Sequence, residues 1–312
     1  MWPMPARRHI QGGEDATGRY APSPTGTLHL GNLRTALLAW LWARGDGARF
    51  VVRIEDVDTG RSRERFVAEH LCDLAALGLD WDGEVVRQSQ RTELYAEALA
   101  ALEARGLVYE CWCTRAEIRE AAAAPHGARA EGAYPGTCAA LGRGARAERR
   151  RSGRPAALRV RAEGAQVTVE DRLRGPVSSV VDDLVLRRTD GDWAYNLAVV
   201  VDDHQQGIRE VVRGADLLET TPRQAWLHAT LGYGTPPAYA HVPLMLGPDG
   251  TRLAKRHGAI TLAERAAEGH GPADVRAELA ASVGLCAPGE RPEPAALVAH
   301  FDPALLIGTA SG

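Results

Sequence analysis

Hydrophobic and polar positions in the first hundred residues follow a pattern that predicts strands alternating with helices. A short strand is expected at Arg19 to Ala21, ended by the turn cluster from Pro22 to Gly26. Helical spacing follows from about Gly31 to Arg44, and the apolar run from Arg49 to Glu55 predicts a buried strand. Further helices are expected at about Arg61 to Leu77 and Thr92 to Arg105. This order predicts an α/β fold with a parallel sheet and right-handed crossovers.

The pattern changes near Leu107. A predicted helix at about Arg115 to Ala123 is followed by an Ala/Gly/Arg-rich stretch, and then by strand-like runs at Ala157 to Arg161, Gln166 to Asp171 and Val177 to Val181. Gly and Pro separate these runs, which predicts an inserted, mostly antiparallel subdomain. The parallel pattern then resumes, with strands expected at Leu197 to Val201, Glu210 to Val212 and Ala240 to Leu246, a helix at Pro222 to Leu231, and three helices after Lys255.

Composition narrows the class of protein. The 312 residues are 45% hydrophobic and 25% charged, which is typical of a globular chain, and the net charge of -3 excludes a protein that coats nucleic acid. No apolar run has the length of a membrane-spanning helix, so no membrane association is expected. Residues Met1 to Thr17 carry no apolar stretch and are expected to form a disordered tail rather than a secretory signal. The five cysteines, an odd number, favour thiols or metal ligands in the cytoplasm.

One lysine, Lys255, stands among 37 basic residues, and the others are all arginine. Lysine is a compact point charge that a guanidinium does not mimic, so its retention at one position is either functional or accidental.

The stretch from Gly18 to Asn32 carries the strongest chemical signal. It predicts a strand, a Pro/Gly turn, and a helix that begins at His29 to Asn32. A helix start on a parallel sheet offers backbone N–H groups and a positive dipole end, which suits a triphosphate. Gly31 allows close approach to the backbone, and His29 can donate a hydrogen bond to phosphate. The alternative is an ordinary loop before an amphipathic helix, but the full fifteen-residue string favours the nucleotide site.

Pro22 to Asn32 resembles the HIGH region of class I aminoacyl-tRNA synthetases, in the form found in their glutamyl branch. Four further segments resemble that branch in the same order, and these are Arg53 to Asp58, Tyr195 to His204, Arg213 to Leu218 and Gly250 to Gly258. The resemblance implies a Rossmann-like parallel-sheet catalytic domain over residues 18–106 and 190–258. It also implies a mixed, zinc-type insert over 107–189 and a short helical C-terminal segment over 259–312, after the tail at 1–17 and without an anticodon-binding domain.

The resemblance also implies a glutamate pocket. Its members would be Arg19, Tyr20, Ala21, Pro22, Ser23, Glu55, Tyr195 and Arg213. Arginine forks bind carboxylates in bidentate fashion, and Glu55 can pair with the ammonium group. Aspartate would leave a buried arginine poorly paired, so the pocket would discriminate against it. Taken singly, each of these residues could equally be a structural ion pair or a core tyrosine.

The segment Arg252 to Arg256 resembles the family's KMSKS loop, and Lys255 takes the place of its ATP-contacting lysine. The resemblance therefore assigns catalysis to His29 and Lys255, and ATP binding to His29, Gly31, Asn32, Arg252 and Lys255, with Mg²⁺ accompanying ATP. Two positions depart from the motif: Arg252 keeps a charge, whereas Ala254 lacks the usual hydroxyl.

Cys111, Cys113, Tyr134 and Cys138 form a candidate structural zinc site with three thiolates and a phenolate. From the residues alone, reduced thiols without metal are an equal alternative, and the resemblance favours zinc.

Two further clusters allow two interpretations each. The arginines of the insert either follow an RNA backbone or belong to a solvated loop balanced by Glu148, and they are Arg143, Arg146, Arg149, Arg150, Arg151 and Arg154. The acidic pair Asp202 and Asp203, with His204, could contact Mg²⁺ or substrate, or could have a helix-capping or packing role.

The shortened members of the glutamyl branch transfer glutamate to the queuosine base in the anticodon loop of tRNA(Asp). The resemblance therefore implies ATP, L-glutamate and queuosine-containing tRNA(Asp) as partners of a monomeric enzyme. Three alternatives are a truncated glutamyl-tRNA synthetase that charges tRNA(Glu), a non-catalytic paralogue that binds glutamate or tRNA, and another nucleotidyl transferase with a HIGH motif.

Overall fold

The computed structural model of the chain describes residues 17–122, 134–245 and 260–307, and its main element is a seven-stranded sheet with the order β3-β2-β1-β9-β10-β6-β7. Neighbouring strands from β3 to β6 pair in parallel, and the hairpin β6–β7 at one edge is antiparallel. The strands of this sheet are β1 (Thr17–Tyr20), β2 (Arg49–Ile54), β3 (Val86–Arg87), β6 (Gln166–Asp171), β7 (Gly175–Val180), β9 (Glu210–Gly214) and β10 (Ala238–Val242).

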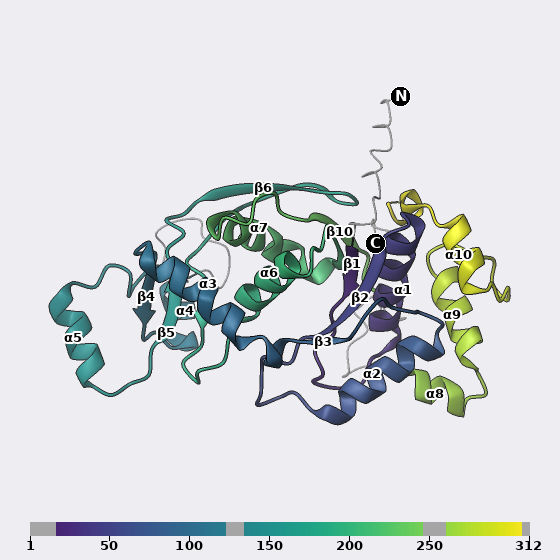
Figure 1. The fold of residues 1–312 in the computed structure, drawn as a ribbon, viewed down its shortest axis with the longest axis horizontal. Coiled ribbons are helices and arrows are strands. Elements are labelled where there is room, and N and C mark those ends of the chain that lie inside the picture. Colours follow the sequence, from purple (N-terminus) through teal and green to yellow (C-terminus); the bar gives the residue numbers. More distant parts are fainter. Residues whose placement is uncertain (1–16, 123–133, 246–259, 308–312) are drawn as a thin grey trace.

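Helices cover both sides of this sheet (Figure 1). Helix α1 (Leu30–Gly45) lies on one side, with α9 (Pro272–Ala281) and α10 (Pro294–His300) packed outside it. Because α1 is enclosed by the sheet and by these helices, it is apolar around most of its circumference. On the other side lie α6 (Tyr195–Gln205) and α7 (Thr221–Thr230). The remaining helices of this region are α2 (Glu64–Ala76), α3 (Thr92–Ala104) and α8 (Leu262–Ala267).

The inserted segment forms a second, three-stranded antiparallel sheet with the order β4-β5-β8. Its elements are β4 (Val108–Cys111), α4 (Arg115–Ala122), α5 (Arg143–Arg151), β5 (Ala157–Val160) and β8 (Val185–Arg187). The hairpin β6–β7 interrupts this sheet in sequence and joins the edge of the parallel sheet instead, where Asp171 is opposite Tyr239. The insert therefore reaches back to the main sheet.

The predicted fold class is confirmed. The protein has a mostly parallel sheet, a mixed insert with a cysteine cluster, and short helices after the last strand. One predicted element is wrong: Leu197 to Val201 belongs to helix α6 and is not a strand. All five residues are buried, and a short run that is apolar on every side has no period that distinguishes a strand from a covered helix. Thr17 is also not part of a tail, since it is buried in β1 and pairs with Arg49.

Across the described residues, no helix is both long enough and apolar enough to cross a membrane.

Candidate active site

The turn after β1 is held in place by backbone hydrogen bonds to the segment that follows β2. Glu55 donates its N–H to the carbonyl of Pro22 at 3.0 Å, and Arg63 donates to the carbonyl of Pro24 at 3.0 Å. Both segments leave the carboxyl ends of neighbouring parallel strands, and β9 lies on the other side of β1. Where the connections from adjacent parallel strands lead in different directions, a crevice forms between them at the carboxyl edge of the sheet.

Helix α1 begins at this crevice with His29 as its N-cap. The Asn32 N–H donates to Nδ1 of His29 at 3.3 Å, and the Asn32 side chain accepts from the His29 N–H at 3.2 Å. Because Nδ1 accepts a hydrogen bond, the neutral imidazole carries its hydrogen on Nε2, which is the nitrogen able to donate. A side chain at Gly31 would place its Cβ 3.0 Å from the His29 ring, so glycine keeps the start of the helix clear.

A cavity of about 660 Å³ opens at the same edge of the sheet. Its lining includes all eight residues predicted for glutamate and three of those predicted for ATP, and they are Arg19, Tyr20, Ala21, Pro22, Ser23, His29, Gly31, Asn32, Glu55, Tyr195 and Arg213. Arg252 and Lys255, the two other predicted ATP residues, lie outside the described residues, as does Ala254.

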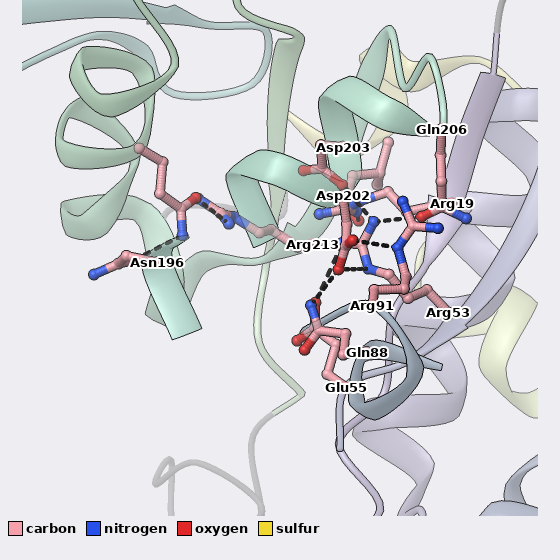
Figure 2. A network of polar contacts seen from close by, with 12 residues as sticks. Arg19, Arg53, Glu55, Gln88, Arg91, Asn196, Asp202, Asp203, Gln206 and Arg213 are labelled. Carbon is pink, nitrogen blue, oxygen red and sulfur yellow. Dashed lines mark hydrogen bonds and ion pairs between the residues drawn. The ribbon is translucent and has the colours of Figure 1, made fainter. Parts of the chain in front are cut away.

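A buried network of ions lies behind this cavity, with Arg53 at its centre (Figure 2). The Arg53 side chain is 0% exposed and contacts Oδ1 of Asp203 at 2.8 Å and Oε1 of Glu55 at 3.3 Å. Asp203 also faces Nε of Arg19 at 3.5 Å, while Nη1 of Arg19 donates to the carbonyl of Val212 at 3.1 Å. The two cavity residues Arg19 and Glu55 are therefore fixed from behind by Arg53 and Asp203.

Asp202 has a structural role in the same network. Its carboxylate is fully buried and accepts hydrogen bonds from Gln88 at 2.8 Å, Arg91 at 2.6 Å and Tyr95 at 2.7 Å. These contacts favour the packing interpretation of the acidic pair. His204, the third member of that sequence cluster, stacks on the ring of Tyr233 at 3.8 Å.

Burial sets the protonation of two cavity side chains. It raises the pKa of Tyr195, so the phenol keeps its hydrogen and can donate to a ligand. Burial also raises the pKa of Glu55, whereas the nearby Arg53 and Arg19 act in the opposite direction. The charged form of Glu55 therefore depends on these arginines, and a ligand ammonium group would favour it further.

A second cavity, of about 570 Å³, shares Ser23, Thr25, Glu55 and Tyr195 with the first. From there it extends toward the insert, where its lining includes Cys113, Arg115, Arg159, Arg188 and Trp193. The two cavities meet where Glu55 and Tyr195 lie, so a group bound in one can reach a group bound in the other.

The three cysteines of the insert lie together, with all sulfur atoms within 4.8 Å of one another. The sulfur atoms of Cys113 and Cys138 are 3.5 Å apart, and the Tyr134 hydroxyl lies 3.4 Å from the sulfur of Cys111. Bonds of about 2.3 Å to a tetrahedral zinc ion place two sulfur atoms about 3.8 Å apart, so this donor set fits the metal. Within the described part of the chain, no other group of His, Cys, Asp or Glu ligands is as compact.

The arginine-rich helix α5 has no buried residue and lies at the end of the molecule far from the C-terminal helices (Figure 1). Arg150 pairs with Glu110 at 2.7 Å and Arg154 with Glu117 at 3.7 Å, so these two are balanced by acids of the insert. Arg146 donates to the carbonyl of Ala139. Glu148, the proposed balancing acid, is exposed.

Sequence reasoning gave no role to Arg53, His241 or Asp171. Arg53 could have been noticed as a charge between the apolar residues Val52 and Ile54 of a buried strand. His241 contacts Arg213 at 3.0 Å, but in the sequence it is only a histidine within an apolar strand. Asp171 lies 70 residues away in the insert, so the sequence does not indicate its contact with His241.

Comparisons with known proteins agree with the geometry. Residues 16–285 match the family described as tRNA synthetases class I (E and Q), catalytic domain. A glutamyl-Q tRNA(Asp) synthetase of Nocardia farcinica is 58% identical over 289 residues, which cover 93% of this chain and 90% of that protein. One from Symbiobacterium thermophilum is 48% identical over 297 residues, covering 91% and 92% respectively.

Among solved structures, a glutamate tRNA ligase of Elizabethkingia meningosepticum in complex with its amino acid is similar, with a TM-score of 0.77 and 27% identity. A glutamate-tRNA synthetase of Elizabethkingia anophelis has a TM-score of 0.78 and 26% identity. The similarity covers 93% and 92% of this chain but only 65% and 66% of those two chains. This chain thus spans about two thirds of the length of these synthetases.

Proposed function

The chain belongs to the class I tRNA synthetases of the glutamate and glutamine type, and we propose that it activates L-glutamate with ATP and transfers the glutamyl group to queuosine in the anticodon loop of tRNA(Asp). One observation carries the proposal: the eight residues expected to bind glutamate line a single cavity together with the start of helix α1. Relatives that match this chain over nine tenths of their length are named glutamyl-Q tRNA(Asp) synthetase, which supports the choice of acceptor.

Glutamate would bind by its charges. Arg19 and Arg213 would each hold one carboxylate, Glu55 would pair with the ammonium group, and Tyr195 would donate its hydroxyl hydrogen. Aspartate is one methylene shorter and cannot reach both arginines at once. One buried guanidinium would then lack its partner, which disfavours aspartate strongly.

ATP would bind with its phosphates at the N-terminus of α1, where backbone N–H groups and Nε2 of His29 can donate. A glutamate carboxylate oxygen attacks the α-phosphorus, forming glutamyl-adenylate and releasing pyrophosphate. His29 and Lys255 would stabilise the charge that develops on the phosphate oxygens, and Gly31, Asn32 and Arg252 would contribute to binding. Mg²⁺ bound with the phosphates would neutralise part of their charge.

A hydroxyl of the acceptor base would then attack the glutamyl carbonyl carbon, and AMP would leave. The second cavity is the candidate place for this base, because it shares Glu55 and Tyr195 with the first and is open to the insert. Exposed arginines of α5 would contact RNA phosphates at a distance from the site. Cys111, Cys113, Tyr134 and Cys138 would hold a zinc ion that keeps the insert folded, in a monomeric enzyme.

Transfer of radiolabelled glutamate to defined tRNAs tests the proposal. We expect labelling of tRNA(Asp) that contains queuosine, including the same tRNA without its 3′-terminal adenosine. An unmodified tRNA(Asp) transcript should remain unlabelled. Labelling of intact tRNA(Glu) at its 3′ end would instead identify a truncated glutamyl-tRNA synthetase and overturn the choice of acceptor. Glutamate binding with no transfer to any tRNA and no ATP turnover would identify a non-catalytic paralogue.

A further inference from the structure

We propose that Asp171 and His241 are positioning residues that orient Arg213 for the substrate carboxylate, and that they connect the inserted hairpin to the amino-acid pocket. The role assigned to Arg213 rests on the proposed function. The hydrogen-bond chain that reaches it is a feature of the structure and can be tested separately.

Arg213 is 5% exposed, and its guanidinium is fixed by three neighbours. Its Nε donates to Nε2 of His241 at 3.0 Å, Nη1 to Gln224 at 2.7 Å and Nη2 to the hydroxyl of Thr221 at 2.9 Å. Gln224 and Thr221 belong to helix α7, whereas His241 lies on β10 next to β9. Of these three neighbours, only His241 can change its hydrogen-bonding role with its tautomer.

The contacts define that tautomer. An arginine has no acceptor atom, so Nε2 of His241 must accept and the ring hydrogen must be on Nδ1. Nδ1 lies 2.6 Å from Oδ2 of Asp171, a carboxylate that only accepts. The chain of donors therefore runs from His241 to Asp171 on one side and from Arg213 to His241 on the other.

Asp171 is itself held rigidly. Its other oxygen, Oδ1, accepts backbone hydrogen bonds from Leu173 at 3.0 Å, Arg174 at 3.0 Å and His241 at 3.3 Å. These N–H groups fix the carboxylate at the end of β6, where the turn of the β6–β7 hairpin begins. A segment of the insert thus determines which nitrogen of a catalytic-domain histidine faces Arg213.

Asp171→Asn tests this arrangement because the three backbone donors keep the side-chain oxygen at the Oδ1 position. The amide NH₂ then faces Nδ1 of His241 and donates to it, which moves the ring hydrogen to Nε2. Nε2–H would then point at the hydroxyl of Thr221, which lies 3.1 Å away and can accept, and the Nε–H of Arg213 would face a donor in place of its acceptor. Loss of a hydrogen bond to a charged group predicts about a ten- to hundredfold rise in KM for glutamate. We assign the side-chain carboxylate of glutamate to Arg213. The kcat and the KM for ATP should then change little, because this carboxylate does not react and its contact is equal in the ground and transition states.

His241→Gln provides the rescue. Its carboxamide oxygen can accept from Arg213 near the position of Nε2 and needs no help from Asp171. In this background Asp171→Asn should no longer raise the KM for glutamate. If Asp171 served only to fold the hairpin, the penalty would persist in the double variant. Glu170→Gln is the control, because Glu170 is exposed and the substitution removes the same charge one residue away from Asp171. This variant should have the same KM for glutamate as the parent.

The pH profile gives a second readout. The groups facing His241 are Asp171 on β6, Arg213 on β9, Arg19 on β1 and Tyr239 on its own strand. Burial lowers the pKa of His241, as do the two arginines, whereas Asp171 raises it. Protonation would remove the acceptor at Nε2, so the KM for glutamate should rise as pH falls through this pKa. His241→Gln should abolish that dependence.

The tautomer can be measured without any activity. In ¹⁵N-histidine NMR of the whole protein, we expect His241, assigned by its loss in His241→Gln, to be neutral with Nδ1 protonated, and to change to Nε2 protonation in Asp171→Asn. An Nε2-protonated ring in the parent protein would overturn the proposal even if the enzyme acts on another substrate. A parent that exchanges pyrophosphate with glutamate, beside an Asp171→Asn variant with unchanged KM, would overturn it while leaving the proposed function intact.

Discussion

Replacing Arg53 by methionine should destabilise the protein strongly, because it removes the cation on which two buried acids depend. The Arg53 side chain is 0% exposed, lies 2.8 Å from Asp203 and 3.3 Å from Glu55, and also donates to Gln206 at 2.8 Å. Among the described residues, the ion pair left to Asp203 is the 3.5 Å contact with Arg19, and Glu55 is left without an ion pair. Removing one partner of a buried ion pair costs about 3–5 kcal/mol, which corresponds to roughly 5–8 °C in Tm for a chain of this size.

The loss of stability caused by Arg53→Met should depend on pH. Burial already raises the pKa of Glu55, and without Arg53 it should rise further. A carboxyl group whose folded pKa exceeds its unfolded value stabilises the native state fully below the unfolded pKa, and this contribution is lost as pH rises through the folded pKa. The stability difference between parent and Arg53→Met should therefore be smaller at about pH 5 than at about pH 8.

Urea unfolding followed by circular dichroism at both pH values measures these differences. Arg61→Met is the matched control, because Arg61 is 75% exposed in its side chain and pairs with Asp58 on the surface. Such a pair contributes about 0–1 kcal/mol, so this variant should unfold close to the parent. An Arg53→Met protein within about 1 kcal/mol of the parent at both pH values would refute the account of the buried network.

Three further predictions concern single side chains. Burial raises the pKa of Glu210 to about 7, so Glu210→Gln should increase the free energy of unfolding by about 1–2 kcal/mol at pH 8 and change it little below the unfolded pKa of about 4.5. Equal free energies of unfolding for the two proteins at pH 8 would contradict this. Cys138→Ser should lower the zinc content, measured by mass spectrometry, from one ion per chain toward zero and reduce thermal stability, with exposed Cys72→Ser as the control; a metal-free parent would contradict the site. His29→Ala should reduce kcat for glutamate-dependent pyrophosphate exchange about 10²–10³-fold with a smaller change in the KM for glutamate, and an unchanged kcat would exclude His29 from the chemical step.

The fold class could be predicted from the sequence because strands and helices with clear periods alternate over the first hundred residues. The prediction of a strand at Leu197 to Val201 was wrong because the spacing of hydrophobic residues does not distinguish a strand from a helix there. Helix α6 is covered by other elements, and these residues are apolar on every side. The strand that pairs with the β6–β7 hairpin could not be predicted from the sequence either. Its alternating pattern specifies an antiparallel pair, but the pairing of Asp171 with Tyr239 depends on the tertiary arrangement of segments about 70 residues apart.

The candidate site was predictable where its residues belong to short local motifs. The turn from Ala21 to Ser23, Glu55 and Arg213 all lie at the carboxyl ends of parallel strands, which meet at one edge of the sheet. His241 and Asp171 act through Arg213 rather than on a ligand, and their residue types and spacing do not indicate this. Tertiary contacts of this kind become visible only when the packing of β6 against β10 is known.

Amino-acid-dependent exchange of pyrophosphate into ATP tests the central claim most directly. We predict exchange with L-glutamate in the absence of tRNA, little or none with L-aspartate, and its loss in Lys255→Ala. Exchange that requires tRNA would contradict assignment to the shortened members of the glutamyl branch. Absence of glutamate-dependent exchange, with tRNA and without it, would contradict the claim that this chain activates glutamate.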